Sequence, residues 1–228
     1  MKIEIGESLI YSWLRHEKQC QIVQTNWKTS PNWQIDGSKK EKLKELMEKA
    51  NKLFIDGKDY TANTFKNNAS IDQVIRQGEC DVIGIQVKDA KPNITAIDVA
   101  FHENGLNYGS RQETVMKVIT KSLRTAMCVY GFMGVETADI IFASPKVNNA
   151  VLNDLNAKLD IARKFFKDNR LEFSLQLIVN DSFNEKILSK ITGYSREIAD
   201  TTELFLRSYQ LCEMFDVNKR KLNRKRSI

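Results

Sequence analysis

The chain has 228 residues, of which 42% are hydrophobic and 28% charged, with 10 Gly and only 3 Pro. This composition is typical of a globular protein, and it excludes collagen-like, low-complexity and disulfide-scaffold classes. The formal net charge of +6 comes entirely from residues 219–228, because the rest of the chain has equal numbers of basic and acidic residues.

Apolar residues at helical spacing predict an amphipathic helix over residues 5–18, followed by a short strand over 21–27. A turn-rich stretch, 29–37, separates this strand from a lysine-rich amphipathic helix over 38–55. The remaining predicted elements, in chain order, are helix 70–77, strands 80–87 and 94–101, helix 114–133, strand 138–145, helix 148–169, strand 171–180, and helices 181–191 and 195–215.

The order of these elements predicts an α/β fold with a mixed central β-sheet flanked by helices. Residues 80–101 read as an antiparallel hairpin, and the strand–helix–strand pattern over 94–180 predicts parallel crossover connections. We therefore expect one domain over residues 1–218, with 28–79 as a helical insertion. Residues 219–228 form a basic tail that we expect to be disordered.

The cysteines and the lengths of the apolar runs indicate the cellular compartment. Cys20, Cys80, Cys128 and Cys212 are far apart with no CxxC pair, and the chain has only two histidines, so we expect free thiols rather than a zinc site. No apolar run reaches the roughly 18 residues of a membrane span, and the N-terminus lacks the pattern of a signal peptide. We expect a cytoplasmic protein with no membrane partner.

Two acidic residues stand out in the predicted hairpin. Asp98 lies between Ile97 and Val99 in an apolar strand, where a carboxylate costs free energy unless it is paired or binds a cation. Asp81 begins the neighbouring strand. Two carboxylates on adjacent strands suit Mg²⁺ (or Mn²⁺), which takes oxygen ligands, and Glu7 in the first helix would complete the site.

Each acid also has an alternative, purely structural interpretation. Asp81 can cap the end of a strand, and Asp98 can be a core acid in a salt bridge. Glu7 lies in the first turn of a helix, where the helix dipole favours an acidic side chain.

With these residues in this order, the sequence resembles the restriction-endonuclease-like, PD-(D/E)xK superfamily of nucleases. Glu7 in G-E-S-L matches the acid of the family's first helix, Asp81 in C-D-V-I the Asp that opens its second strand, and Asp98 in A-I-D-V-A the acid of its acid-x-Lys tripeptide. The resemblance covers residues 1–27 and 79–145. It implies an αβββαβ core, a metal-dependent DNA endonuclease that hydrolyses phosphodiester bonds, and a bacterial defence or restriction setting.

The sequence departs from the family at the motif lysine, because Ala100 occupies that position. Some family members supply the lysine from the following helix, where Lys117 is the natural substitute, with Lys121 one turn further on. His102 is two residues beyond Ala100 and is an alternative base or phosphate contact. We therefore predict Asp81, Asp98, Lys117 and His102 as catalytic residues.

The basic tail is the predicted contact to DNA. Its cations hold phosphate groups by counterion release, unless it is only a solvated chain end. The residues concerned are Lys219, Arg220, Lys221, Arg224, Lys225 and Arg226. A homodimer is expected by analogy, because cleavage of both strands commonly needs two active sites.

Two other functions fit the same residues. Ala100 favours a catalytically degenerate nuclease-fold protein that acts as a nucleic-acid-binding or assembly module. A plain α/β interaction protein, in which Asp98 is only salt-bridged, is the third hypothesis.

Overall fold

The computed structural model describes residues 4–30, 32–54, 70–71, 78–199 and 201–215. Its five-stranded sheet has the order β1-β2-β3-β4-β5, antiparallel from β1 to β3 and parallel from β3 to β5. The predicted α/β class with a mixed sheet is therefore confirmed. The strands are β1 (Ile22–Lys28), β2 (Glu79–Lys88), β3 (Lys91–Val99), β4 (Thr137–Ser144) and β5 (Glu172–Val179).

The predicted hairpin forms through a turn of two residues. Lys88 pairs with Lys91, and the residues between them, Asp89 and Ala90, have φ angles of 50° and 59°. Positive φ at both central positions is typical of a type I′ turn, whose twist matches that of the flanking antiparallel strands. The turn brings the far ends of β2 and β3, which hold Asp81 and Asp98, to the same end of the sheet.

Helices provide the two parallel crossovers. α4 (Arg111–Cys128) continues into a π-helical turn, η2 (Val129–Met133), and connects β3 to β4, whereas α5 (Asn149–Asp168) connects β4 to β5. α4 begins three residues earlier than predicted, because Ser110 and Glu113 form a reciprocal capping box that fixes its first turn.

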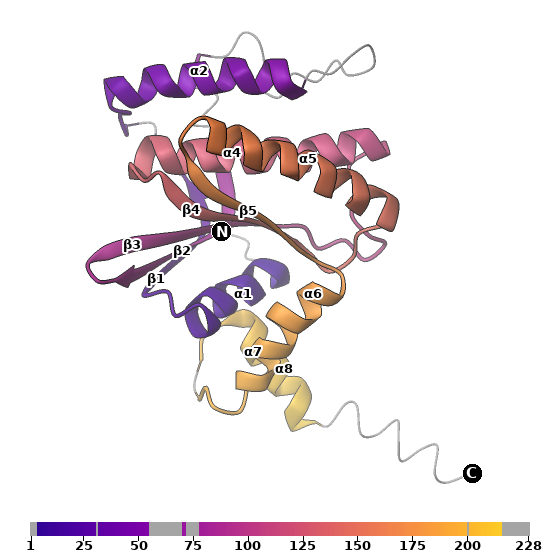
Figure 1. The fold of residues 1–228 in the computed structure, drawn as a ribbon. Helices are drawn as coiled ribbons and strands as arrows, with labels where there is room; N and C mark the ends of the chain where they lie inside the picture. The colour runs from indigo at the N-terminus through magenta and orange to yellow at the C-terminus, as the bar shows by residue number, and fades with distance from the viewer. Residues whose placement is uncertain (1–3, 31, 55–69, 72–77, 200, 216–228) are drawn as a thin grey trace.

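The sheet separates two layers of helices (Figure 1). α4 and α5 cover one face, and α2 lies outside them as a third layer, whereas the N-terminal and C-terminal helices cover the other face. Each face has its own apolar core, one built around α4 and α5 and the other around α1. The remaining elements are α1 (Ile5–Ser12), η1 (Trp13–Glu17), α2 (Gly37–Phe54), α6 (Asp181–Phe183), η3 (Asn184–Leu188), α7 (Ser189–Tyr194) and α8 (Leu204–Met214).

The helix predicted over 195–215 is wrong in its described residues before Leu204, where α8 begins. The described residues before it are held by tertiary hydrogen bonds instead. Gln210 of α8 donates to the carbonyl oxygens of Ser195 and Ile198, and the Ser195 hydroxyl donates to Glu213. These contacts fold the segment back onto α8, so its helical sequence pattern is overridden.

The described part of the expected insertion, 28–79, contains α2, whose apolar face is buried around Leu43 and Leu46. Helix 70–77 and residues 55–69 lie largely outside the described residues. All four cysteines are free, as predicted, with only Cys212 exposed. Within the described residues, every helix is too short or too polar to cross a lipid bilayer.

Candidate functional site

Asp81 and Asp98 lie where β2 and β3 stop pairing. Val82 pairs with Ile97, so the same register places Asp81 and Asp98 beside each other one step further along the hairpin. Asp81 Oδ2 accepts a hydrogen bond of 2.7 Å from the backbone amide of Val99. The Asp81 carboxylate thus replaces a backbone acceptor where the β2–β3 hydrogen bonds end. This is the strand-end role that the sequence offered as the structural alternative for Asp81.

Asp98 is a buried acid with a partner on each oxygen. Only 2% of the residue is exposed. Lys121 Nζ lies 3.2 Å from Oδ1, and the Thr125 hydroxyl donates to Oδ2 at 3.3 Å. Burial raises the pKa of Asp98 to about 6, and the charge of Asp81 adds to the rise, while Lys121 and Thr125 moderate it. Asp98 therefore keeps its proton to a higher pH than an exposed aspartate does.

Lys121 reaches Asp98 from α4, the helix above this face of the sheet. Lys121 and Thr125 are one helical turn apart, so both project toward the same strand. Burial by itself lowers the pKa of Lys121, but the charges of Asp98 and Asp81 and the hydrogen bond to Asp98 outweigh it, and the net pKa is raised. The lysine side chain, 38% exposed, links the buried acid to the surface.

The two predicted bases make other contacts. Lys117 is exposed, and its Nζ donates to the Tyr108 carbonyl oxygen at 3.0 Å while lying 5.6 Å from the centre of the Tyr108 ring. The His102 ring meets the same tyrosine edge-on, with ring centres 5.5 Å apart. Lys121, rather than Lys117, is thus the lysine that contacts Asp98.

Tyr108 contacts both Lys117 and His102 and is influenced by the charges of the acids. Its backbone amide donates to Thr114 Oγ1 at 3.0 Å, which fixes the loop between β3 and α4. Burial raises the pKa of its hydroxyl, Lys121 opposes this rise, and the negative charges of Asp81 and Asp98 add to it. The tyrosine hydroxyl therefore lies within the electrostatic field of the acids and the lysine.

Glu7 lies near enough to Asp81 for their charges to interact. It belongs to α1, and its Oε2 accepts a 3.0 Å hydrogen bond from the side-chain amide of Asn26 on β1. Asn26 has a φ of 50°, a left-handed conformation that asparagine tolerates better than most residues. Burial raises the pKa of Glu7, and the charge of Asp81 raises it further.

The three carboxylates therefore do not close around one point. α1 and α4 lie on opposite faces of the sheet (Figure 1), and Glu7 belongs to α1, whereas Asp98 contacts Lys121 of α4. Among the described residues, no three His, Cys, Asp or Glu side chains are grouped closely enough to hold a metal ion. Asp81 and Asp98 are next to each other in the register of the hairpin.

Ala100, at the position of the motif lysine, is 4% exposed and packs in the core beneath α4. A lysine at this position would have to bury its charge in apolar surroundings, which is costly. The amine supplied from α4 avoids this cost, because Lys121 keeps part of its side chain in solvent.

The six predicted basic contacts in 219–226 lie outside the described residues. No known protein family, curated protein or solved structure matches this chain.

Sequence reasoning missed Thr125, Tyr108 and Asn26 as members of this site. Thr125 had a recognisable signal, because it follows Lys121 by one turn on a helix whose other inward positions are mostly apolar. Tyr108 and Asn26 had none, because each depends on a loop or a left-handed residue whose conformation the pattern does not specify.

Proposed function

We propose that this chain is a metal-dependent DNA endonuclease of the restriction-endonuclease-like superfamily, acting through Asp81, Asp98 and Lys121. One observation carries the proposal: the Lys121 ammonium lies 3.2 Å from Asp98, which stands beside Asp81 at the end of the hairpin. An acid pair with a lysine is the set of side chains that the resemblance requires, with Lys121 in place of a lysine at Ala100. The chain order α1, β1, β2, β3, α4, β4 also supports this core.

The donor set suits a magnesium ion. Mg²⁺ is usually bound by one or two carboxylates together with water and substrate phosphates. Asp81 and Asp98 are therefore the right number and type of protein ligand. Burial raises the pKa of Asp98, and the nearby charge of Asp81 adds to the rise, so a divalent cation bound beside both carboxylates would favour the charged form of Asp98. When bound, the metal supplies a polarised phosphate and a water of lowered pKa.

The chain's own residues then have separate roles. Val99 and Thr125 orient the carboxylates of Asp81 and Asp98 through hydrogen bonds. The Lys121 ammonium stabilises the negative charge that develops on the phosphate oxygens, a contribution made by preorganised cations in phosphoryl transfer. Tyr108 lies in the same field and orients a phosphate or water through its hydroxyl.

The test is cleavage of supercoiled plasmid with Mg²⁺ and, separately, Mn²⁺. We expect cleavage by the wild type, no cleavage in EDTA or with Asp98→Asn, and a loss of about 10²-fold or more with Lys121→Met. Lys117→Met is the matched control, because it removes an ammonium one turn earlier on α4 that bonds to a backbone oxygen. Loss with Lys117→Met but not with Lys121→Met would reverse the assignment of the lysine.

A homodimer belongs to the same proposal. Paired active sites cut both strands in one encounter, so linear plasmid should form without prior accumulation of nicked circles, and sedimentation should give twice the chain mass. Nicked circles that accumulate first, from a monomer, would contradict this part.

A second candidate function has its own supporting observation. Both oxygens of Asp98 are occupied by Lys121 and Thr125, and the residue is 2% exposed. This closed arrangement favours a catalytically degenerate module that binds nucleic acid without cutting it. Salt-sensitive retention of DNA, with no cleavage in either metal, would support this function over the first.

A further inference from the structure

A pocket of about 480 Å³ lies outside the carboxyl ends of the parallel strands β3 and β4. The loop after β3 forms one wall, and the loop after β4 with the start of α5 forms the other. This edge of an open parallel sheet is where α/β proteins commonly bind ligands. The volume is within the range of about 300–1,000 Å³ that is typical of small-molecule sites.

The pocket walls are fixed by hydrogen bonds. The Leu106 amide donates to the Lys146 carbonyl oxygen at 2.8 Å, which joins the two loops. The Asn180 side chain accepts from the Val147 amide at 2.7 Å and donates to the Val147 carbonyl oxygen at 3.0 Å. A wall held in this way does not need to be ordered by its ligand, which lowers the entropic cost of binding.

The polar side chains that line the pocket use their oxygens as acceptors within the protein, so their hydrogen-bond donors remain for a ligand. The side-chain oxygens of Asn107 and Asn148 already accept from the amides of Gly109 and Ala150, so their NH₂ groups remain to bind a ligand. Thr114 is 1% exposed, and its oxygen accepts from the Tyr108 amide, which leaves its hydroxyl hydrogen to donate.

The charges that line the pocket are positive. Lys146 is exposed there and makes one long contact, 3.4 Å, to the Glu103 carbonyl oxygen. The Arg111 guanidinium bonds to Asp154 through Nε and Nη2, which leaves Nη1 to donate. Among the described residues that line this pocket, none is acidic.

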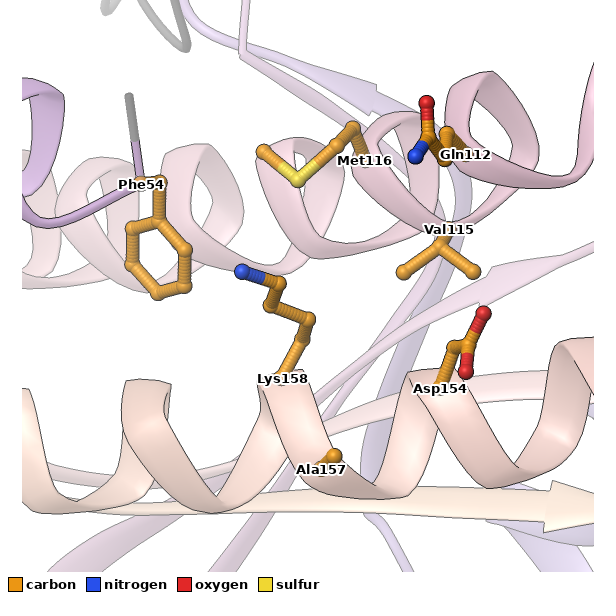
Figure 2. A pocket seen from close by; sticks show the side chains of 7 residues that line it. All are labelled: Phe54, Gln112, Val115, Met116, Asp154, Ala157 and Lys158. Atoms are coloured by element: carbon orange, nitrogen blue, oxygen red, sulfur yellow. The ribbon is translucent and has the colours of Figure 1, made fainter. Parts of the chain in front are cut away.

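A second pocket differs from the first in having a largely apolar lining. Figure 2 shows it between α4 and α5, with Met116 and Val115 on one side and Lys158 on the other, and its volume is about 240 Å³. The Arg111–Asp154 ion pair separates the two pockets, because Arg111 lines the larger one and Asp154 the smaller.

We propose that the larger pocket binds the phosphate group of a nucleotide, either free or within a nucleic-acid strand. A phosphate group only accepts hydrogen bonds and carries negative charge, so it complements a pocket of donors and cations. The volume leaves room for the attached sugar, which meets the apolar side chains of Leu106 and Val151. The proposal goes beyond the proposed nuclease function and does not depend on hydrolysis at Asp98.

The test uses the full chain in EDTA, so that binding is measured without cleavage. The probes are 2′-deoxyadenosine 5′-monophosphate, 2′-deoxyadenosine and a short single-stranded oligodeoxynucleotide. Binding is followed by the side-chain amide NMR signals of Asn104, Asn107 and Asn148. We expect the monophosphate or the oligonucleotide to shift these signals, and the nucleoside to leave them unchanged.

Lys146→Gln should weaken this binding by about three- to tenfold, as expected for one partly solvated charge contact. Lys167→Gln, which removes an exposed lysine near the other end of α5, is the matched control and should leave binding unchanged. Arg111→Gln provides a second variant, and thermal unfolding verifies that each variant is folded.

The pattern of binding among the three probes identifies the ligand. Binding of the monophosphate identifies a free nucleotide as a sufficient ligand, whereas binding of the oligonucleotide alone identifies a strand phosphate. No shift with either probe, equal binding of the nucleoside, or equal weakening by Lys146→Gln and Lys167→Gln would overturn the proposal. Because no metal is present, these results are independent of the cleavage test on Asp98.

Discussion

The Lys121 ammonium lies 3.2 Å from the carboxylate of Asp98, and this pair joins α4 to the end of β3. The acid is almost completely buried, whereas more than a third of the lysine side chain is exposed. The lysine therefore provides the neutralising charge that a carboxylate in an apolar strand requires, while more than a third of its own side chain stays in solvent.

Replacing this lysine should destabilise the fold. Lys121→Met keeps the length of the side chain but leaves Asp98 without its cation, and the free energy of unfolding should fall by about 1–3 kcal/mol. Lys117→Met should change it by less than about 0.5 kcal/mol, because Lys117 is exposed. Urea unfolding of both variants measures the difference.

The double variant Asp98→Asn with Lys121→Met completes a double-mutant cycle, which measures the interaction free energy of this pair. A neutral asparagine no longer needs the cation, so the double variant should be more stable than Lys121→Met alone. Equal losses from Lys117→Met and Lys121→Met would show that the pair contributes nothing specific.

Asp98 also predicts a pH dependence of stability. Its pKa in the folded chain, about 6, is above the ordinary value of 3.8, so the folded state holds this proton more tightly than the unfolded state. The resulting stabilisation is complete below about pH 4 and is lost as the pH rises through 6. Relative to Asp98→Asn, the wild type should therefore lose about 2 kcal/mol between pH 4 and pH 7.

The measurement is urea unfolding at several pH values, with the carboxyl carbon of Asp98 followed by NMR. The carbon should titrate with a midpoint near 6. Stability curves of wild type and Asp98→Asn that stay parallel from pH 4 to pH 7 would contradict the prediction.

The sheet was predictable from the sequence because its signals are local. Alternating and continuous apolar runs mark each strand, and Asp89-Ala90 lies between two of them where the chain must reverse. The unusual acids were equally visible, because an aspartate between Ile97 and Val99 breaks an apolar run.

The partners of those acids were not predictable. Whether Lys117 or Lys121 reaches Asp98 depends on how the buried apolar face of α4 packs against the sheet. Likewise, α8 begins late because Gln210 holds the preceding segment in a non-helical form. Both results depend on contacts between residues that are distant in the sequence, and local periodicity carries no information on them.

Gly84 permits a close approach of β2 to Leu14 of η1 and to Cys20, which follows η1. A Cβ at this position would lie 2.8 Å from the Cys20 Sγ and 3.2 Å from a methyl carbon of Leu14. Both neighbours are buried and cannot move away freely. Gly84→Ala should therefore lower the free energy of unfolding by about 1–3 kcal/mol through overpacking.

The control for this prediction is Gly37→Ala at the start of α2, where a Cβ would meet nothing within 4 Å. This variant should be neutral or slightly stabilising, because alanine restricts the unfolded chain. Urea unfolding compares the two variants, and a Gly84→Ala protein as stable as Gly37→Ala would refute the close approach.

Glu203 attaches the C-terminal helix to the first one. Its buried carboxylate accepts a 2.5 Å hydrogen bond from the Ser12 hydroxyl, contacts His16 Nε2 at 2.9 Å, and lies 3.3 Å from Arg15 Nη1. Glu203→Gln keeps the shape but removes the charge that these three groups share, and it should cost about 1–3 kcal/mol. Because Glu203 directly precedes α8, this helix should also become easier to cleave by a protease.

Glu197→Gln is the matched control, since Glu197 is exposed and six residues earlier in the chain. It should leave both the unfolding free energy and the rate of proteolysis at α8 unchanged. If both glutamine variants lose the same stability, or if α8 in Glu203→Gln resists the protease as well as in the wild type, then Glu203 does not attach α8 to α1. Since α1 also holds Glu7, a released α8 should in addition shift the NMR signal of the Glu7 carboxyl, whereas the control should not.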